Sequence, residues 1–353
     1  MRKYWTRMSN KKAVGVIGAG SFGLTIADLL SVNQDVWIFA RRTEVVEQIN
    51  QTHTYQGLQL AKHVKATDKP EVLCEQCTLL FPAVPSKSFA NMIRTFAPYL
   101  RPSHLMIHCT KGFDLKGLDE GRLQDMTLSR DQIRTMSEVI LEESVVKRVG
   151  CLAGPNLAKE IQEGKPTASV IASPYDELIE MGQEALNSDR FFVFASHDMI
   201  GAELAGGLKN IIALGSGILE GLNMGKNIQA MLITRGLREM IYIGKAMGAD
   251  SRAFLGTAGI GDLIATATSS KSRNFSVGYR LGQGESLASI LESMDEVAEG
   301  VRTLQIAQQL AEHYNVTVPI IRNLHRVVYK GLDMRNAIGY LMKFPYAPDV
   351  DFL

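Results

Sequence analysis

The stretch Ala13–Leu30, "AVGVIGAGSFGLTIADLL", sets the expected fold. A short apolar segment leads into Gly-Ala-Gly-Ser-Phe-Gly at 18–23, and an amphipathic helical pattern follows. In this strand–turn–helix context Gly18 allows a tight turn, Gly20 lets the backbone approach a pyrophosphate, and Gly23 lets helix pack on strand. The free N–H groups at the start of the helix attract the anion. The stretch therefore predicts a dinucleotide-binding turn.

The next predicted strand, Asp35–Phe39, indicates which dinucleotide is bound. It is followed by Ala40-Arg41-Arg42 and not by an acidic residue. A carboxylate here would bind ribose hydroxyls and repel a 2′-phosphate, whereas an arginine attracts that phosphate. The sequence thus favours NADP and leaves NAD open. Alternatively, Arg41 and Arg42 are only the solvated start of a helix.

The length and the charge of the chain narrow the classes of protein to which it could belong. The chain has 353 residues, which favours two domains. Its 38 basic and 37 acidic side chains nearly cancel, so the chain has no overall positive electrostatic field that would attract nucleic acid or an anionic membrane. We see no apolar run of about 20 residues that would span a membrane. Residues 1–12 are expected to be a disordered lead-in without a secretory signal, and Met8 is an alternative start.

The cysteines and histidines give no sign of a metal site. Cys74 and Cys77 form a C-x-x-C pair without a second pair to complete a zinc site, so we interpret them as structural. His104 and His108 have helical ligand spacing, but they lie in a predicted strand without a third ligand. The four cysteines are expected to be reduced, which favours the cytoplasm.

Strands and helices alternate up to residue 195. "HVKAT", "TLLFPAV", "LMIHCT", "TASVIAS" and "FFVFAS" are typical of strands, and residues 113–148 are expected to leave the sheet. Beyond His197 the period becomes helical, with helices expected at about 199–222, 227–247, 274–283, 285–293, 300–313 and 319–331. We predict an α/β fold: a doubly wound Rossmann domain at 13–195, then an all-α domain at 196–353.

Lys209 is unusual within the first of these helices. Its neighbours one turn away are small or apolar, among them Ala205, Gly206 and Ile212. An unpaired buried ammonium costs several kcal/mol, so Lys209 needs a partner. Asp262, in a glycine-flanked segment, is the expected partner.

Two further stretches bear candidate binding residues. Lys111 follows a predicted strand at the mouth of the cofactor crevice. Arg273 and Asn274 stand where a new helix begins, so their side chains and free N–H groups could converge on one phosphate. Most of 266–272 is expected to be a flexible, capped loop.

Together these residues resemble the bacterial NAD(P)-dependent glycerol-3-phosphate dehydrogenases. The matching segments run in order along nearly the whole chain: "VIGAGSFGLTIA", "PAVPS", "CTKGFD", "MSEVI", "AGPNLAKEI", "GAELAGGLKNIIALGSGI", "GTAGIGDLIATATSSKSRN" and "VAEGV". The resemblance implies a substrate site between a Rossmann domain and a helical domain, and commonly a homodimer. The segment after Lys111 is longer than in common bacterial members, and its role stays open.

The resemblance also implies a role for each matching residue. Lys209 corresponds to the proton-transferring lysine, and Asn156 stands where the family usually has a hydroxyl residue. The implied substrate-binding residues are Lys111, Gly154, Asn156, Lys209, Asn210, Asp262, Thr266, Ser272, Arg273 and Asn274. The implied cofactor-binding residues are Gly18, Gly20, Ser21, Phe22, Gly23, Arg41, Arg42, Lys111, Ala158, Arg273, Val297 and Glu299.

The sequence thus predicts a reversible NAD(P)H-dependent reduction of dihydroxyacetone phosphate to sn-glycerol 3-phosphate, for glycerophospholipid synthesis. One alternative is a related 3-hydroxyacid or phosphogluconate-type dehydrogenase of the same architecture. Another is a nicotinamide-sensing regulator without activity, although such a protein would need neither the lysine in an apolar face nor the second anion site.

Overall fold

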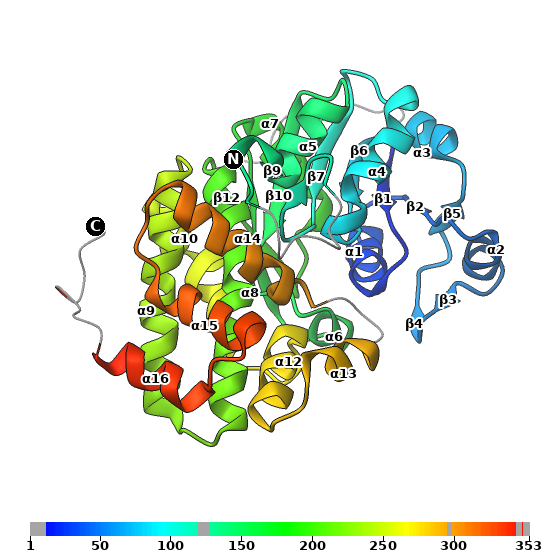
Figure 1. The fold of residues 1–353 in the computed structure, drawn as a ribbon. Helices are drawn as coiled ribbons and strands as arrows, with labels where there is room; N and C mark the ends of the chain where they lie inside the picture. The colour runs from blue at the N-terminus through cyan, green and yellow to red at the C-terminus, as the bar shows by residue number, and fades with distance from the viewer. Residues whose placement is uncertain (1–11, 119–126, 295–297, 344–347, 349–353) are drawn as a thin grey trace.

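The computed structural model describes residues 12–118, 127–294, 298–343 and 348, and Figure 1 shows its ribbon. The expected lead-in at 1–12 lies outside these residues except for Lys12, so it stays a prediction.

Eight strands form one sheet in the order β12-β11-β10-β7-β6-β1-β2-β5. All neighbouring pairs in this sheet are parallel except β10 with β11, which are antiparallel. The strands are β1 (Ala13–Ile17), β2 (Val36–Phe39), β5 (Lys65–Thr67), β6 (Cys77–Pro82), β7 (Leu105–His108), β10 (Arg148–Ala153), β11 (Thr167–Ala172) and β12 (Phe191–Ser196). The predicted doubly wound sheet is confirmed, and the antiparallel pair is a feature that the strand pattern did not reveal.

Helices cover both faces of this sheet (Figure 1). One face packs against α1 (Ser21–Ser31), α2 (Thr43–Thr52) and α7 (Asp176–Leu186). The other packs against α3 (Pro70–Gln76), α4 (Ser86–Phe96) and α5 (Met136–Glu143). Because helices cover both faces, the central strands β1, β6 and β7 are nearly continuous buried apolar runs, whereas the edge strand β12 exposes Phe192 and Phe194.

The strand order reverses at β1, which pairs with β2 on one side and β6 on the other. Ligands of open α/β sheets bind outside the carboxyl ends of the strands at such a reversal. The Gly18 turn lies at this point, because the N–H of Gly18 donates to Phe39 O at 3.0 Å and that of Ala83 donates to Ile17 O at 2.9 Å. The fold thus places the turn where a crevice is expected.

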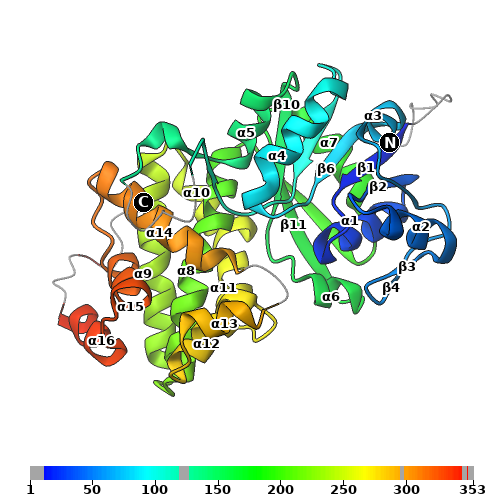
Figure 2. The same ribbon diagram turned by 45° about the vertical axis from the view of Figure 1, so that its right-hand side comes forward.

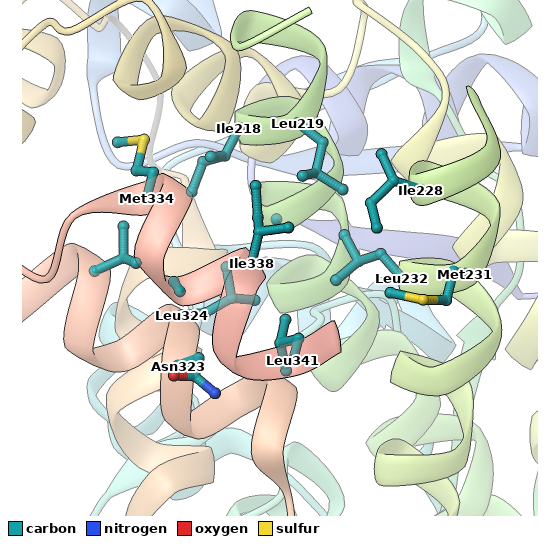
Figure 3. A pocket seen from close by; sticks show the side chains of 13 residues that line it. Ile218, Leu219, Ile228, Met231, Leu232, Asn323, Leu324, Met334, Ile338 and Leu341 are labelled. Carbon is teal, nitrogen blue, oxygen red and sulfur yellow. The ribbon is translucent and has the colours of Figure 1, made fainter. Parts of the chain in front are cut away.

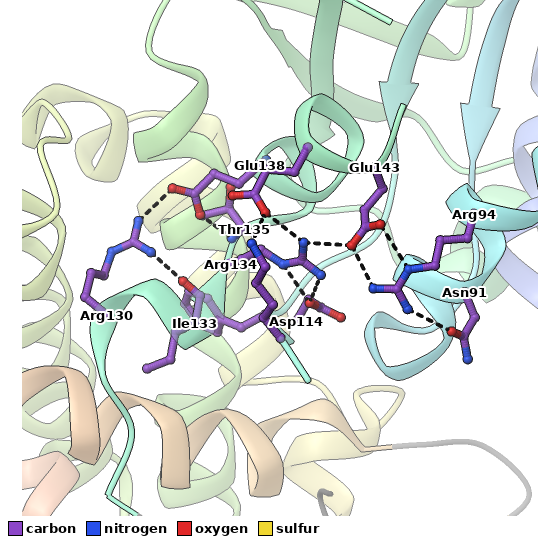
Figure 4. Close-up of polar contacts among 12 residues, drawn as sticks. Asn91, Arg94, Asp114, Arg130, Ile133, Arg134, Thr135, Glu138 and Glu143 are labelled. Carbon is purple, nitrogen blue, oxygen red and sulfur yellow. Dashed lines mark hydrogen bonds and ion pairs between the residues drawn. The ribbon is translucent and has the colours of Figure 1, made fainter. Parts of the chain in front are cut away.

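The described residues of 113–147 lie outside the eight-stranded sheet, as expected, and include α5, before the chain rejoins the sheet at β10. Within them β8 (Asp114–Leu115) pairs with β9 (Ile133–Arg134), while 119–126 lie outside the described residues. Arg134 is 2% exposed and donates to Asp114 Oδ2 at 2.9 and 2.6 Å, and to carboxylates of α5 at 2.9 and 3.0 Å (Figure 4). Charge-assisted bonds of this kind fix the segment that follows Lys111.

The rest of the described chain is helical, and no strand occurs in it after Ser196. Figure 2 shows this helical half beside the sheet half, with α8 against both. Its helices are α8 (Met199–Gly221), α9 (Lys226–Ala246), α10 (Ser251–Leu255), α11 (Asp262–Ala267), α12 (Arg273–Gly282), α13 (Leu287–Glu292), α14 (Glu299–His313), α15 (Pro319–Lys330) and α16 (Met334–Lys343). The six expected helices are present, and α10, α11 and α16 are additional.

Most of 266–272 lies outside the helices, as expected, while Thr266 and Ala267 form the last turn of α11. A π-helical turn at Thr257–Gly261 leads directly into α11. The glycines of this turn allow close packing, since Ala258 and Gly259 are both buried.

Helices α8 and α12 pack backbone to backbone. A Cβ added to Gly278 would lie 1.9 Å from Leu214 O, and one added to Gly217 would lie 2.1 Å from Phe275 O. Contacts this short exclude any side chain at these two positions. This close approach brings the start of α12 beside the middle of α8, where the candidate site lies.

The far end of the bundle contains an apolar cavity of about 40 Å³ between α8, α9, α15 and α16. Ile218, Leu232, Leu324 and Ile338 point into it (Figure 3). The residues that line it belong to the hydrophobic core of the helical half and carry none of the candidate site residues.

A buried carboxylate joins α9 to α15. Glu239 is 3% exposed, and it accepts from the N–H groups of Ile320 at 2.7 Å and Ile321 at 2.9 Å. Burial raises the pKa of Glu239 to about 8, against the opposite effect of the two donors. The carboxylate thus satisfies backbone groups at the start of α15 that have no partner within the helix.

We expect Glu239→Ala to lower the free energy of unfolding by about 3 kcal/mol, because it leaves two buried N–H groups without acceptors. Urea unfolding followed by circular dichroism measures the change. The control is Glu292→Ala on exposed α13, for which about 0.5 kcal/mol or less is expected. Equal stabilities of the two variants would contradict the structural role of Glu239.

Candidate active site

The turn between β1 and α1 has the geometry that a pyrophosphate requires. Gly18 has φ +120°, and a Cβ there would lie 2.8 Å from Ala83 O. A Cβ on Gly23 would lie 2.0 Å from Gly18 O, whereas one on Gly20 would meet nothing within 4 Å. The open side at Gly20 faces a helix start, at Ser21 and Phe22, without a side-chain cap. Its N–H groups therefore remain free for an anion, and the turn fits a dinucleotide.

Two exposed arginines follow β2 beside this turn. Arg42 donates to the hydroxyl of Tyr55 at 2.7 Å, and the side chain of Arg41 is exposed. The end of β2 adjoins the turn through the bond from Gly18 to Phe39. Two guanidinium groups here suit a 2′-phosphate better than an unphosphorylated ribose.

Asp262 binds two lysines from different halves of the molecule. Lys209 Nζ donates to Asp262 Oδ1 at 2.6 Å, and Lys111 Nζ donates to Asp262 Oδ2 at 2.7 Å. Lys209 also bonds the hydroxyl of Thr266, one turn after Asp262 in α11. Lys209 and Asp262 are 5% and 1% exposed. The expected partner of Lys209 is therefore in contact with it, and Lys111 shares that partner.

Burial lowers the pKa of Lys209 to about 7, and the positive charge of Lys111 acts in the same direction. The carboxylate of Asp262 opposes this effect but does not cancel it. A lysine whose pKa lies near neutrality can both give and take a proton. The cluster therefore has the chemistry of a general acid–base site.

The turn after β10 closes one side of this cluster. Gly154 has φ +125°, and its carbonyl oxygen accepts from Lys111 Nζ at 2.9 Å. Asn156 accepts a bond from the Ser169 hydroxyl, which leaves its amide nitrogen buried without a partner among the described residues. Ala158 begins α6 (Ala158–Gln162), which contacts α1. The turn thus links the cluster to the dinucleotide turn.

The start of α12 lies on the opposite side. Asn274 Nδ2 donates to Asn210 Oδ1 at 2.9 Å, and Asn274 Oδ1 accepts from the N–H of Gly300 at 2.8 Å. Ser272 caps the helix by accepting from Phe275 N at 3.3 Å, and Arg273, in the first turn, is exposed. A cation and a helix N-terminus therefore lie one turn from the asparagine pair, as an anion site requires.

Glu299 joins the helical half to the sheet half at the cleft. Its carboxylate accepts from Ser86 N at 3.1 Å and Ser86 Oγ at 2.8 Å, at the start of α4. Arg302, one turn later, donates to Phe113 O at 2.5 Å and to Ser86 Oγ at 3.3 Å. Val297 lies outside the described residues. The sequence analysis did not identify Arg302 as a site residue. Its position three residues after Glu299, on the same face of a helix, is the pattern that could have indicated it.

In the described ranges no helix is long and apolar enough to cross a membrane. Nor does that part of the chain hold a group of three or more His, Cys, Asp or Glu side chains arranged for a metal.

Two family models match the chain. The model of the NAD-dependent glycerol-3-phosphate dehydrogenase N-terminus matches residues 13–179, and that of the C-terminus matches residues 198–339. Among curated relatives, the glycerol-3-phosphate dehydrogenase [NAD(P)+] of Alcanivorax borkumensis is 37% identical over 347 residues, covering 97% of both chains. The protein of the same name from Pseudomonas aeruginosa is 36% identical and covers 98% of both.

Solved structures agree with the family models. The glycerol-3-phosphate dehydrogenase of Coxiella burnetii superposes with a TM-score of 0.83 at 29% identity, covering 95% of this chain and 99% of that one. A ketopantoate reductase from Ralstonia eutropha, at 16% identity and a TM-score of 0.56, shares the fold alone. From the two family models and the full-length relatives, we conclude that the chain belongs to the NAD-dependent glycerol-3-phosphate dehydrogenase family.

Proposed function

We propose that this protein catalyses the reversible NAD(P)H-dependent reduction of dihydroxyacetone phosphate to sn-glycerol 3-phosphate, for glycerophospholipid synthesis. The observation that carries the proposal is the Lys209–Asp262–Lys111 cluster, in which Lys209 and Asp262 are buried and Lys209 adjoins Asn210, the partner of Asn274 at the start of α12. Family membership and the printed names of the full-length relatives support the same reaction.

The cofactor is NAD or NADP, as in the relatives named NAD(P)+-dependent. We assign its pyrophosphate to Gly18, Gly20, Ser21, Phe22 and Gly23. The further contacts in this proposal are Lys111, Ala158, Arg273, Val297 and Glu299, with Arg41 and Arg42 at the ribose. The two exposed arginines favour NADP. When bound, the reduced nicotinamide supplies the hydride that reaches the substrate carbonyl carbon.

In the proposed mechanism Lys209 donates the proton in reduction and accepts it in oxidation. Negative charge grows on the ketone oxygen during reduction, and the Lys209 ammonium stabilises this charge and then protonates the oxygen. In the reverse direction the neutral amine takes the proton from the hydroxyl. Asp262 and Thr266 orient the amine. Lys111, held by Asp262 and Gly154, adds positive charge and lowers the pKa of Lys209.

The remaining substrate contacts hold the phosphate and the carbon chain. We assign the phosphate to Ser272, Arg273 and Asn274 at the start of α12, where a cation and helix N–H groups coincide. Asn210 binds the substrate beside them, and Gly154 and Asn156 complete the wall opposite. Binding energy from the phosphate orients the carbonyl, which does not itself contact α12.

A related 3-hydroxyacid or phosphogluconate-type dehydrogenase is the alternative reaction on this architecture. It is less well supported, because the ketopantoate reductase match shares only the fold, while the glycerol-3-phosphate dehydrogenases match the whole chain. A nicotinamide sensor without activity would have no use for a buried lysine whose pKa lies near neutrality.

The proposal extends to a cytoplasmic homodimer. All four cysteines are free and buried, as expected in a reducing compartment. The dimer follows from the resemblance, and light scattering of the purified protein tests it.

The deciding assay compares NADH and NADPH oxidation with dihydroxyacetone phosphate, 3-oxoacids and ketogluconate-type acids as substrates. We expect turnover with dihydroxyacetone phosphate and a higher kcat/KM with NADPH. Turnover confined to the acids would favour the alternative reaction, and nucleotide binding without any turnover would favour the sensor.

Lys209→Ala should lower kcat for dihydroxyacetone phosphate reduction by about 10²–10⁴-fold, because it removes the proton donor. Affinity for NADPH, measured by nucleotide fluorescence, should stay nearly unchanged. The matched control is Lys226→Ala on the same half, whose side chain is 79% exposed. An unchanged kcat in Lys209→Ala would refute the assignment.

The pH dependence should have opposite signs in the two directions. Reduction needs the Lys209 ammonium, so its kcat/KM should fall as pH rises above about 7, the pKa of Lys209. Oxidation needs the free amine, so its kcat/KM should rise through the same range. Initial rates across a buffer series measure both profiles. Parallel profiles in the two directions would exclude Lys209 as the titrating group.

Arg273→Ala should chiefly raise the KM for dihydroxyacetone phosphate, because it removes a cation from the phosphate site. Unphosphorylated dihydroxyacetone serves as the internal control, since its weak turnover should be affected little. An equal loss with both substrates would count against a phosphate contact.

A further inference from the structure

A buried contact between a histidine and a carboxylate connects β7, the strand that precedes Lys111, to the helix that carries Lys209. His108, the last residue of β7, lies three residues before Lys111, and Glu203 lies two turns before Lys209 on α8. His108 Nε2 is 2.9 Å from Glu203 Oε1, and the two side chains are 1% and 4% exposed. The mechanism proposed above uses neither side chain.

Glu203 has a second set of contacts on α5. Its Oε1 accepts from the N–H of Ser137 at 2.9 Å, and its Oε2 accepts from the Ser137 hydroxyl. Burial alone would raise the pKa of Glu203, but His108 and Ser137 hold it below the ordinary value. The carboxylate therefore joins three elements, α8, β7 and α5, at one buried point.

The groups around His108 offer no polar partner that could replace Glu203. The ring of His108 packs edge-on against Phe89, with centroids 5.9 Å apart. Among the described residues its Nδ1 has no hydrogen-bond partner, and its Nε2 makes a close contact with Glu203 that is not aligned as a hydrogen bond. The neighbouring thiols of Cys109 and Cys151 stay neutral, because burial raises the pKa of both. Without Glu203, His108 would thus be a buried polar ring with no acceptor nearby.

The same two elements meet again at the active cluster. Beyond His108, the chain at 111–113 lies directly on α8, because a Cβ on Gly206 would come within 3.6 Å of the Lys111 side chain and one on Gly207 within 3.4 Å of Phe113. The Lys111–Asp262–Lys209 contacts then join the segment after β7 to α8 through α11. Two polar links, one buried and one largely buried, therefore span one interface.

We propose that His108 and Glu203 are positioning residues that set the placement of Lys209 relative to Lys111 around Asp262. This inference rests on the function proposed above. Neither residue touches the substrate or the cofactor. Loss of the pair lets α8 and the end of β7 shift, and a misplacement of about 1 Å at a reacting group can cost about 10²-fold in rate.

The proposal is tested with Glu203→Gln, His108→Asn and His108→Gln, assayed for dihydroxyacetone phosphate reduction with NADPH. We expect Glu203→Gln and His108→Asn to lower kcat at least about tenfold, with the KM for NADPH changed less than about twofold. His108→Gln should retain most activity, because its longer amide can still donate to Glu203 from near the Nε2 position. The double variant His108→Asn/Glu203→Gln should be no slower than the slower single variant, since both remove one link.

The pH profile gives a readout that general destabilisation does not move. Separation of Lys111 from Lys209, or entry of water, removes influences that lower the pKa of Lys209. The midpoint of kcat/KM for reduction should therefore shift to higher pH in Glu203→Gln and His108→Asn. Glu239→Gln is the matched control, since Glu239 is another buried carboxylate that accepts two bonds, away from the cluster. It should lose stability while keeping kcat and the pH midpoint.

Three results would overturn the proposal: a Glu203→Gln kcat within twofold of the wild type, an unshifted pH midpoint, or an equal loss of kcat in Glu239→Gln. If Glu203→Gln fails to fold, the contrast between His108→Gln and His108→Asn carries the same test. A wild-type protein that is inactive with dihydroxyacetone phosphate would instead contradict the proposed function.

Discussion

One buried carboxylate shared by two lysines is the constraint on which the site depends. Asp262 occupies both of its oxygens with Lys209 and Lys111, so the cluster keeps an excess positive charge in a poorly solvated place. Burial is the main cause that lowers the pKa of Lys209 to about 7, Asp262 opposes it, and the charge of Lys111 acts in the same direction as burial and also favours an anionic ligand. A cluster of two lysines that share one carboxylate therefore suits both the proposed proton transfer and the proposed binding of a phosphorylated ketone.

The architecture around Asp262 brings distant segments of the chain together. Lys111 comes from the sheet half and Lys209 from α8, and glycines on α8 and α12 let their backbones touch so that Asn274 reaches Asn210. Small residues appear wherever these segments cross, because a side chain there would separate groups that must lie within hydrogen-bond distance. The small residues on these segments therefore serve both the close packing of the backbones and the placement of the site residues.

Polar links cross between the two halves on more than one side of the cleft. Glu299 binds the start of α4, and Lys271 donates to Glu163 at 2.9 and 3.0 Å on α6's side of the cleft. The exposed lysine pair contributes little stability, whereas the buried His108–Glu203 pair is costly to break. The buried His108–Glu203 contact is therefore the one suited to hold a fixed geometry.

The sequence by itself determined the architecture and singled out Lys209 as a lysine that needs a buried partner. Glycine spacing at 18–23 and the change of period after 195 are local signals, so the doubly wound sheet and most helices could be predicted from them. The need of Lys209 for a partner was also local, because its helical neighbours are apolar. Only the tertiary structure decided that Lys111 shares Asp262, that Thr266 belongs to a helix, and that His108 meets Glu203. Those facts join residues up to 151 positions apart, and no local pattern encodes the distance between two side chains that meet only when the halves close on each other.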